Sequence, residues 1–214
     1  MTSIRPMEGS GYLVLRETGD LVELLAGDVV LLSSAALATE FAFGALAITL
    51  TPCPPKRVVI GGLGFGATLR AVLDVVSAEA RVTVVEKVGA IPRLVRGPLA
   101  HLARAPLDDP RVELVEGDVG EVVARADGWA DVILMDVDNG PHWASFRSNV
   151  RFYSPAGLAA FRRALAPSGA LAVWSGYRAD AFVHRLREAG FVSSIVPLVA
   201  RGRTRARAYV GRLG

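Results

Sequence analysis

The chain has 214 residues, of which 51% are hydrophobic and 21% are charged, and its formal net charge at pH 7 is +3. This composition is typical of a globular protein with a full hydrophobic core, and the length allows one large domain or one domain with a small appendage. Cys53 is the single cysteine, which excludes an internal disulfide and a thiolate metal cluster.

The start of the chain, MTSIRPMEGSG, lacks the apolar centre of a signal peptide. No apolar run approaches the roughly 20 residues that a membrane-spanning helix needs. We therefore expect a cytoplasmic protein without a membrane segment. The three histidines have no metal-ligand spacing, so we predict no metal site; they are His101, His142 and His184.

Residues 11–33 contain three short strand-forming runs separated by the turn signals TGD and AGD. They predict a small β-meander. The next run, SSAALATEFAFGALAITL, begins with a possible serine cap and is apolar enough for a largely buried helix, which TPCPP ends. These prolines divide the chain into an N-terminal meander with its helix, residues 1–55, and a larger domain, residues 56–214.

From residue 57 onward, apolar β-branched runs alternate with helix-like segments, which predicts a mostly parallel sheet with helices on both faces. The final run, RARAYVGRL, follows the sixth strand after only a short basic turn, so we expect the two to pair antiparallel. The result is a seven-stranded α/β domain. Strands are expected at 57–61, 81–86, 111–115, 131–136, 170–175 and 191–199, and helices at 66–77, 89–104, 118–126, 155–166 and 179–189.

A glycine-rich turn joins the first strand of this domain to its first helix, with Gly62, Gly64 and Gly66 among its residues. Glycines there let a ligand approach the backbone and the N–H groups of the helix start, although tight strand-to-helix packing is the structural alternative. Glu86 ends the second strand, where an acidic side chain accepts hydrogen bonds from ribose hydroxyls. Together these features predict a nucleoside site.

Two further carboxylates follow strands of the same sheet. Asp118 follows the third strand and is positioned to face an adenine amino group, to cap the next helix, or to do both. Asp136 ends the fourth strand and is the best candidate for chemistry, because ligands of open parallel sheets bind outside the carboxyl ends of the strands. Asp138 and Asn139 lie in the turn sequence DNGP and are expected to be structural.

The end of the chain, RGRTRARAYVGRLG, is rich in arginine, and alternation places several of these side chains on one face of a strand. No aromatic interleaving or known nucleic-acid module accompanies them. We therefore expect a solvated sheet edge and no nucleic-acid partner.

Several of these segments resemble one known family. KRVVIGGLGFGATLRAVL, VTVVEK, LDDPRVELVEGD, ADVILMDVDNGP and FYSPAGLAAFRRALAPSGALAVWS are similar to spermidine synthase-type polyamine aminopropyltransferases over about residues 56–176. That family shares the Rossmann-like class I methyltransferase fold, and residues 11–33 resemble a shortened form of its N-terminal β-domain. The resemblance also implies a homodimer.

The resemblance implies decarboxylated S-adenosylmethionine, or S-adenosylmethionine itself, as the group donor and a small amine as the acceptor. Glu86 would hold the ribose, Asp118 the adenine, and the loop from Gly62 to Gly66 would pass beneath the sulfur-bearing chain. Asp136 matches the family's catalytic aspartate. An acceptor amine with a pKa near ~10 is mostly protonated at neutral pH, so a carboxylate is needed to bind it and help remove its proton.

The sequence also departs from the family pattern. Phe65 stands where the family has an aspartate that helps hold the aminopropyl ammonium group. Asn139 stands at the family's second fourth-strand aspartate, and the neighbouring Asp138 is a candidate substitute in substrate binding. Glu40 and Phe41 replace a tyrosine and a glutamine or histidine that bind the substrate, which makes Glu40 a candidate substitute.

His142, after DNGP, is a further candidate for the acceptor pocket, with plain loop packing as its alternative. Three functions therefore stay open: an aminopropyl or alkyl transferase, an S-adenosylmethionine-dependent methyltransferase on the same scaffold, and a catalytically idle nucleoside-binding protein. The missing counter-charge at Phe65 favours the second, and Asp136 with the overall resemblance favours the first.

Overall fold

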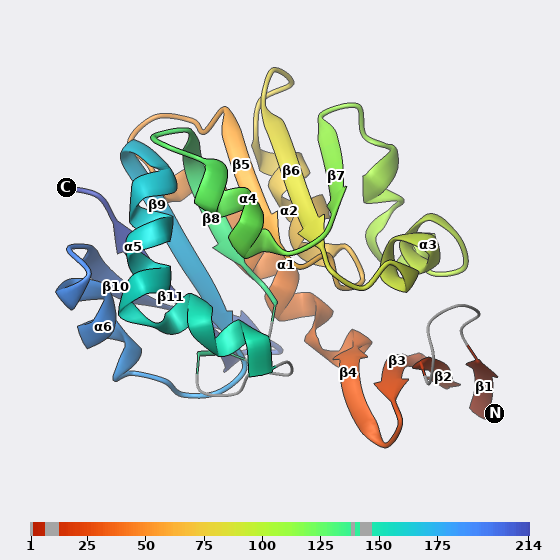
Figure 1. Cartoon of the computed structure of the whole chain (residues 1–214). Coiled ribbons are helices and arrows are strands. Elements are labelled where there is room, and N and C mark those ends of the chain that lie inside the picture. Colours follow the sequence, from red (N-terminus) through yellow and green to blue (C-terminus); the bar gives the residue numbers. More distant parts are fainter. Residues whose placement is uncertain (1, 7–12, 138–139, 142–146) are drawn as a thin grey trace.

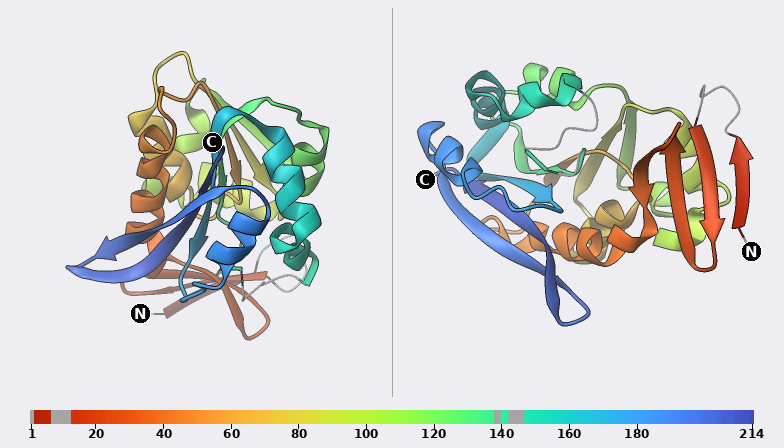
Figure 2. Two further views of the ribbon diagram at one scale, coloured as in Figure 1. Left: turned by 90° about the vertical axis from the view of Figure 1, so that its left-hand side faces the viewer. Right: turned by 90° about the horizontal axis from the view of Figure 1, so that it is seen from below.

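The computed structural model describes residues 2–6, 13–137, 140–141 and 147–214, and it contains a small and a large β-sheet (Figure 1). The small sheet is antiparallel with strand order β1-β2-β3-β4, and the large sheet has the order β10-β11-β9-β8-β5-β6-β7. Figure 2 shows the small sheet at one end of the molecule, beside the large sheet rather than stacked on it.

The predicted meander is confirmed in strands β2 to β4, and β1 pairs antiparallel with β2 as an additional strand. The predicted helix after the meander is also present, as α1 with a short 3₁₀ turn on each side. The hydroxyl oxygen of Ser33 accepts a hydrogen bond from the Ala35 N–H and caps the 3₁₀ turn Ser34–Ala36, whereas α1 itself follows Ala36 without a side-chain cap. The elements are β1 (Thr2–Pro6), β2 (Leu13–Thr18), β3 (Leu21–Ala26), β4 (Val29–Ser33) and α1 (Leu37–Ala45).

The large sheet has the seven strands that the alternating pattern predicts. β5 to β9 pair in parallel, and β11 pairs antiparallel with both β10 and β9. The antiparallel pairing of the last strand is therefore confirmed. The strands are β5 (Arg57–Gly61), β6 (Arg81–Glu86), β7 (Val112–Glu116), β8 (Ala130–Met135), β9 (Leu165–Ser175), β10 (Val192–Ala200) and β11 (Arg203–Arg212).

The expected position of the arginine-rich run is wrong in one respect. β11 lies between β10 and β9, so it is an inner strand and not a sheet edge. Its first arginines, Arg203 and Arg205, are nevertheless exposed, because this end of the β10–β11 hairpin extends beyond β9.

Helices connect the parallel strands, and one of them is shorter than predicted. The expected helix at 89–104 ends as α3 at Arg96 and is followed by a separate 3₁₀ turn, Ala100–Ala103. Gly97 and Pro98 interrupt it, since proline cannot donate a helical hydrogen bond and disfavours helical geometry in the residue before it. The helices are α2 (Ala67–Val75), α3 (Ala90–Arg96), α4 (Val119–Arg125), α5 (Pro155–Ala164) and α6 (Phe182–Glu188).

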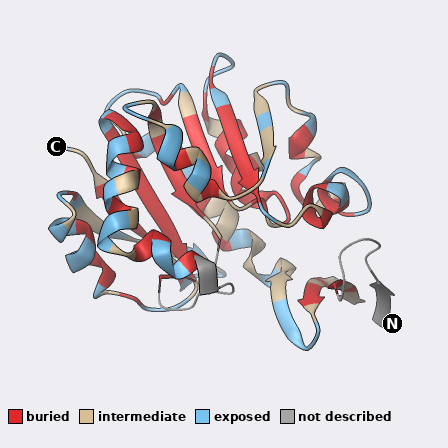
Figure 3. Cartoon of the chain, in the orientation of Figure 1, coloured by how far each residue is buried: buried red, intermediate tan, exposed pale blue. Residues whose placement is uncertain are grey.

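Helices cover both faces of the large sheet because its strands are apolar on both sides (Figure 3). In β8, Val132 and Leu134 face the core that α1 and α2 cover, whereas Ile133 and Met135 face the core beneath α4, α5 and α6. Residues of the small sheet join the first of these cores. The boundary between residues 55 and 56 stays a prediction.

The contact between α1 and α2 is close because Gly44 has no side chain. A Cβ atom at Gly44 would lie 2.3 Å from the carbonyl oxygen of Thr68 and 2.8 Å from the Cβ of Ala71. This packing places α1, which carries Glu40, beside the carboxyl ends of the parallel strands. None of the helices in the described residues is long and apolar enough to cross a membrane.

Candidate functional site

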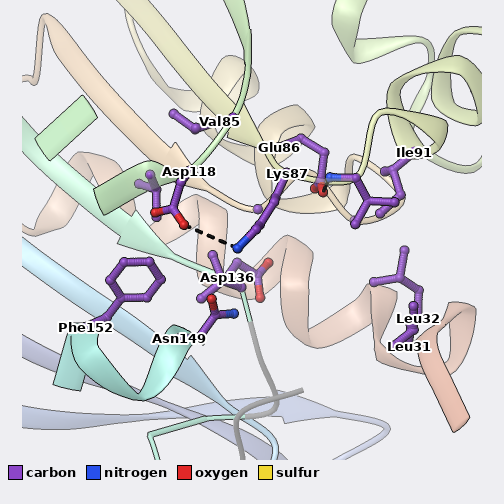
Figure 4. A pocket seen from close by; sticks show the side chains of 16 residues that line it. Leu31, Leu32, Val85, Glu86, Lys87, Ile91, Asp118, Asp136, Asn149 and Phe152 are labelled. Atoms are coloured by element: carbon purple, nitrogen blue, oxygen red, sulfur yellow. Dashed lines mark hydrogen bonds and ion pairs between the residues drawn. The ribbon is translucent and has the colours of Figure 1, made fainter. Parts of the chain in front are cut away.

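A pocket lies where the parallel strands β5, β6, β7 and β8 end, at the place the sequence predicts (Figure 4). Its walls come from the glycine turn after β5, the ends of β6 and β7, and the residues that follow β8. Leu31 and Leu32 of β4 line one side, and Asn149 and Phe152 line the opposite side. We call this the first pocket.

The glycine turn brings the chain close to the end of β8. Gly62 has φ +90°, and a Cβ there would lie 2.2 Å from the carbonyl oxygen of Asp136. Gly64 lines the first pocket, where a Cβ would meet only Leu32, at 3.9 Å. Gly66 packs against Pro106 instead, at 2.8 Å from its would-be Cβ, and the pocket lining does not include it. Gly66 therefore serves tight packing between elements, which was the structural alternative to a ligand-binding role.

Glu86 is buried and fastens the glycine turn to β6. Its Oε2 accepts the N–H of Leu63 at 2.9 Å, and its Oε1 accepts the N–H of Val88 at 2.7 Å. Burial raises the pKa of Glu86, and the backbone hydrogen bonds oppose part of that rise. The side chain lies in the pocket wall, and its role toward a ribose stays a prediction.

Asp118 caps α4 and carries two ion pairs. Its Oδ1 accepts the Gly120 N–H at 2.8 Å and lies 2.6 Å from the Arg151 guanidinium, while Oδ2 lies 3.4 Å from Nζ of Lys87. Burial acts to raise the pKa of Asp118, but the bonds from Gly120 and Arg151 outweigh it and lower the pKa overall. The capping alternative is therefore realised, and the carboxylate already has several donors.

Asp136 lies in the first pocket beside the buried hydroxyl of Thr68, which donates to its Oδ2 at 2.6 Å. Burial raises the pKa of Asp136 to about 6, and the hydrogen bond from Thr68 opposes that rise. Asp136 is consequently mostly ionised at pH 7 and gains a proton in mildly acidic solution.

A second pocket adjoins the first and shares Leu31, Leu32, Gly64, Asp136 and Val137 with it. Glu40 and Trp174 line only the second pocket. Burial and the nearby charge of Asp136 both raise the pKa of Glu40 well above its ordinary value. The docking of α1 thus brings Glu40 and Asp136 together, and Asp136 belongs to both pockets.

Phe65 does not line either pocket. Its side chain is 2% exposed and belongs to the core that α1 and α2 cover. The described residues therefore place no carboxylate in the glycine turn. Two of the other candidates, Asp138 and His142, lie outside the residues that the structure describes, and so does Asn139.

The sequence did not predict several pocket residues. Lys87 is one of them, and the only sequence feature that could have indicated it is its position directly after Glu86, a predicted site residue. Asn149 and Phe152 come from the 3₁₀ segment Arg147–Tyr153, and Leu31 and Leu32 come from the small sheet. No local pattern marks these residues, because their role depends on contacts distant in sequence. The described residues contain no group of three or more His, Cys, Asp or Glu side chains that could hold a metal ion.

Comparisons with known proteins agree with this geometry. The chain is 36% identical over 125 residues to polyamine aminopropyltransferase 1 of Streptomyces coelicolor, covering 58% of this chain and 23% of the relative. It is 32% identical over 173 residues to polyamine aminopropyltransferase 1 of Pseudomonas aeruginosa, covering 77% of this chain and 56% of the relative. The chain matches no protein-family model. It thus spans about half, or less, of the length of these relatives.

Solved structures show the same fold. Spermidine synthase from Thermotoga maritima superimposes with a TM-score of 0.74 at 20% identity, over 94% of this chain and 69% of that one. A methyltransferase from Geobacter sulfurreducens gives a TM-score of 0.56 at 24% identity, over 82% of this chain and 78% of that one.

The structure has an α/β fold of the class I methyltransferase type, with a pocket at the carboxyl ends of its parallel strands. Within that fold, the chain is similar in sequence to polyamine aminopropyltransferases and in structure to a spermidine synthase. The resemblance inferred from the sequence motifs is confirmed.

Proposed function

We propose that the protein transfers an aminopropyl or similar alkyl group from a sulfonium nucleoside to an amine. The observation that carries this proposal is the position of Asp136, which lines both pockets and is the carboxylate at their junction. A donor in the first pocket and an acceptor amine in the second would meet there. The spermidine synthase-like sequence and fold support the same reading.

The first pocket fits a nucleoside donor such as decarboxylated S-adenosylmethionine or S-adenosylmethionine. Glu86 would hold the ribose, while Gly62 and Gly64 would pass beneath the sulfur-bearing chain. At Gly64 and Gly117, both in the pocket wall, a Cβ would meet almost nothing within 4 Å, so the backbone there borders open space. That space accommodates a ligand lying directly against the chain.

Asp136 would bind the acceptor as an ammonium ion and take its proton, so that the neutral nitrogen attacks the carbon bonded to sulfonium and the thioether leaves. Because burial raises the pKa of Asp136 to about 6, its carboxylate is a better base than an exposed aspartate yet still ionised at pH 7. Alignment of amine, carbon and sulfur would supply much of the rate.

Glu40 would provide the second carboxyl group of the acceptor pocket, and a bound cationic amine would favour its ionised form. It lies on α1 next to Asp136. The glycine turn supplies no carboxylate to this pocket, because Phe65 stands at that position and is buried in the core. Two neighbouring carboxylates suit a cationic amine, since the amine offsets their mutual repulsion. Asp138 and His142 remain candidates for the same pocket.

A methyltransferase is the second candidate, and Phe65 is the observation that favours it. A methyl group carries no ammonium, so its transfer needs no counter-charge at that position. A third reading, a nucleoside-binding protein without catalysis, requires that Asp136 have no chemical role.

A product assay by mass spectrometry separates these readings. Purified protein is incubated with a mixture of small amines and with either form of the donor. We expect methylthioadenosine and an aminopropylated amine from decarboxylated S-adenosylmethionine. S-adenosylhomocysteine with a methylated acceptor would establish the methyltransferase instead, and binding of both donors without any product would support the idle protein.

The variant Asp136→Asn tests the catalytic assignment. We expect turnover to fall by at least about 100-fold, in line with loss of a positioned general base, while nucleoside binding stays measurable. Asp127→Asn is the matched control, because Asp127 is exposed and lines neither pocket; this variant should leave turnover unchanged. Equal turnover in Asp136→Asn and wild type would contradict the proposal.

We also propose that the protein works as a cytoplasmic homodimer, in keeping with the resemblance stated above. Light scattering coupled to size-exclusion chromatography measures the mass directly. A mass of one chain across the micromolar range would contradict the dimer.

A further inference from the structure

Asn149 is a buried amide in the wall of the first pocket. It belongs to the 3₁₀ segment Arg147–Tyr153 that precedes α5, and its side chain is 5% exposed. Figure 4 shows the amide group directed into the pocket, beside Asp136 and on the opposite side from Leu31 and Leu32.

The other polar side chains of this pocket already have partners within the protein. Glu86 accepts two backbone N–H groups, Asp118 accepts from Gly120, Arg151 and Lys87, and Asp136 accepts from Thr68. In the described part of the chain, no hydrogen bond joins the Asn149 side-chain amide to another group.

The Asn149 amide therefore faces the open space of the pocket, where a ligand can form its hydrogen bonds. Polar groups in a largely buried site are usually hydrogen-bonded, so a ligand that displaces water from this pocket must supply partners for the amide. Asn149 has both a C=O acceptor and an NH₂ donor available, so its best partner carries a donor and an acceptor side by side. The edges of adenine do, since the 6-amino group lies next to N7 on one side and N1 on the other.

We propose that Asn149 reads the adenine of the bound nucleoside, its C=O accepting from the 6-amino group and its NH₂ donating to the adjacent ring nitrogen. Asp118, with its cap and two ion pairs, lies in the wall of the same pocket. This inference rests on the proposed nucleoside donor and adds the residue that makes the site specific for adenine.

Binding calorimetry with two thioether nucleosides tests it without any turnover. One is 5′-methylthioadenosine, and the other is the same molecule with a purine that lacks the 6-amino group. We expect wild type to prefer the adenine form by about 10-fold or more, the usual range for a bidentate base contact. In Asn149→Leu, a substitution of similar volume, the adenine form should bind about 10-fold more weakly and the preference should disappear.

Val150→Ala, a change at an exposed neighbour in the same segment, is the matched control and should retain both affinities. Thermal unfolding checks that Asn149→Leu is folded. If wild type binds neither nucleoside, the proposed function fails together with this inference. If wild type binds both and Asn149→Leu retains the full preference for adenine, only the inference fails, and Asp118 or the backbone selects the base.

Discussion

The proposed role of Asp136 requires a carboxylate that is both buried and charged, and a hydrogen bond from Thr68 stabilises that charge. The Thr68 hydroxyl lies within 2.6 Å of Oδ2 of Asp136 and 3.3 Å of the backbone carbonyl of Glu40. It has one proton, and the shorter contact with a charged acceptor takes it. Thr68 therefore stabilises the ionised form of Asp136, and it acts as a positioning residue that does not itself touch the reacting atoms.

Thr68→Val should move the pH dependence of activity. Valine keeps the volume but removes the donor that lowers the pKa of Asp136, so this pKa should rise above its value of about 6. The acid limb of kcat/KM should shift to higher pH by about 1–2 units, since a hydrogen bond to a charged group contributes about 1.5–3 kcal/mol. The pH profile of the two proteins measures this shift.

Thr83→Val provides the matched control for that profile. Thr83 is also buried and donates to a carboxylate, that of Glu113 at 3.2 Å, but lies in β6 outside both pockets. The Thr83→Val variant should leave the acid limb of kcat/KM at the same pH as in wild type. An unchanged limb in Thr68→Val as well would show that Asp136 does not control the reaction.

At the scale of elements, the glycine turn holds β5, β6 and β8 in register around the site. Gly62 touches the backbone of Asp136, and Glu86 accepts the N–H of Leu63 in the same turn. α1 completes the arrangement by packing its Gly44 against α2. The positions of Asp136 and Glu40 therefore depend on two close backbone contacts that only glycine allows.

Gly62→Ala should destabilise the protein more than Gly64→Ala. Both residues have positive φ, at which alanine costs about 1–2 kcal/mol. Only the Gly62 variant also forces a Cβ to within 2.2 Å of a backbone oxygen, whereas at Gly64 the nearest atom is 3.9 Å away. Chemical denaturation of both variants measures the difference in the free energy of unfolding. Equal losses would mean that the β5 and β8 ends separate without cost.

The elements themselves were largely predictable from sequence, because alternation of apolar runs is a local signal. The interruption of α3 was also present in the sequence at Gly97 and Pro98, and the predicted helix overran it. Asn149 and the proximity of Glu40 to Asp136 were not predictable, since they depend on how distant elements pack. Carboxylates at strand ends were predictable because the topology of a parallel sheet alone brings them together.

At the scale of the whole molecule, the site lowers the stability of the fold that carries it. In the unfolded chain the pKa of an aspartate is about 3.9, and in the folded protein burial raises that of Asp136 to about 6. The folded state thus binds more protons between these pH values, so the free energy of unfolding decreases as pH rises through this window. Above pH 6 the charge is buried and its full cost is present.

Asp136→Asn should therefore stabilise the protein at neutral pH while it abolishes turnover. The pKa difference sets an upper limit of about 3 kcal/mol for this gain. At pH 4.5 Asp136 is largely protonated in the folded state, so the substitution should change the melting temperature little there. Thermal unfolding of both proteins at pH 4.5 and 7.5 tests the pattern: a gain at pH 7.5 alone identifies a buried charge at Asp136, and an equal change at both pH values would contradict a raised pKa of this residue.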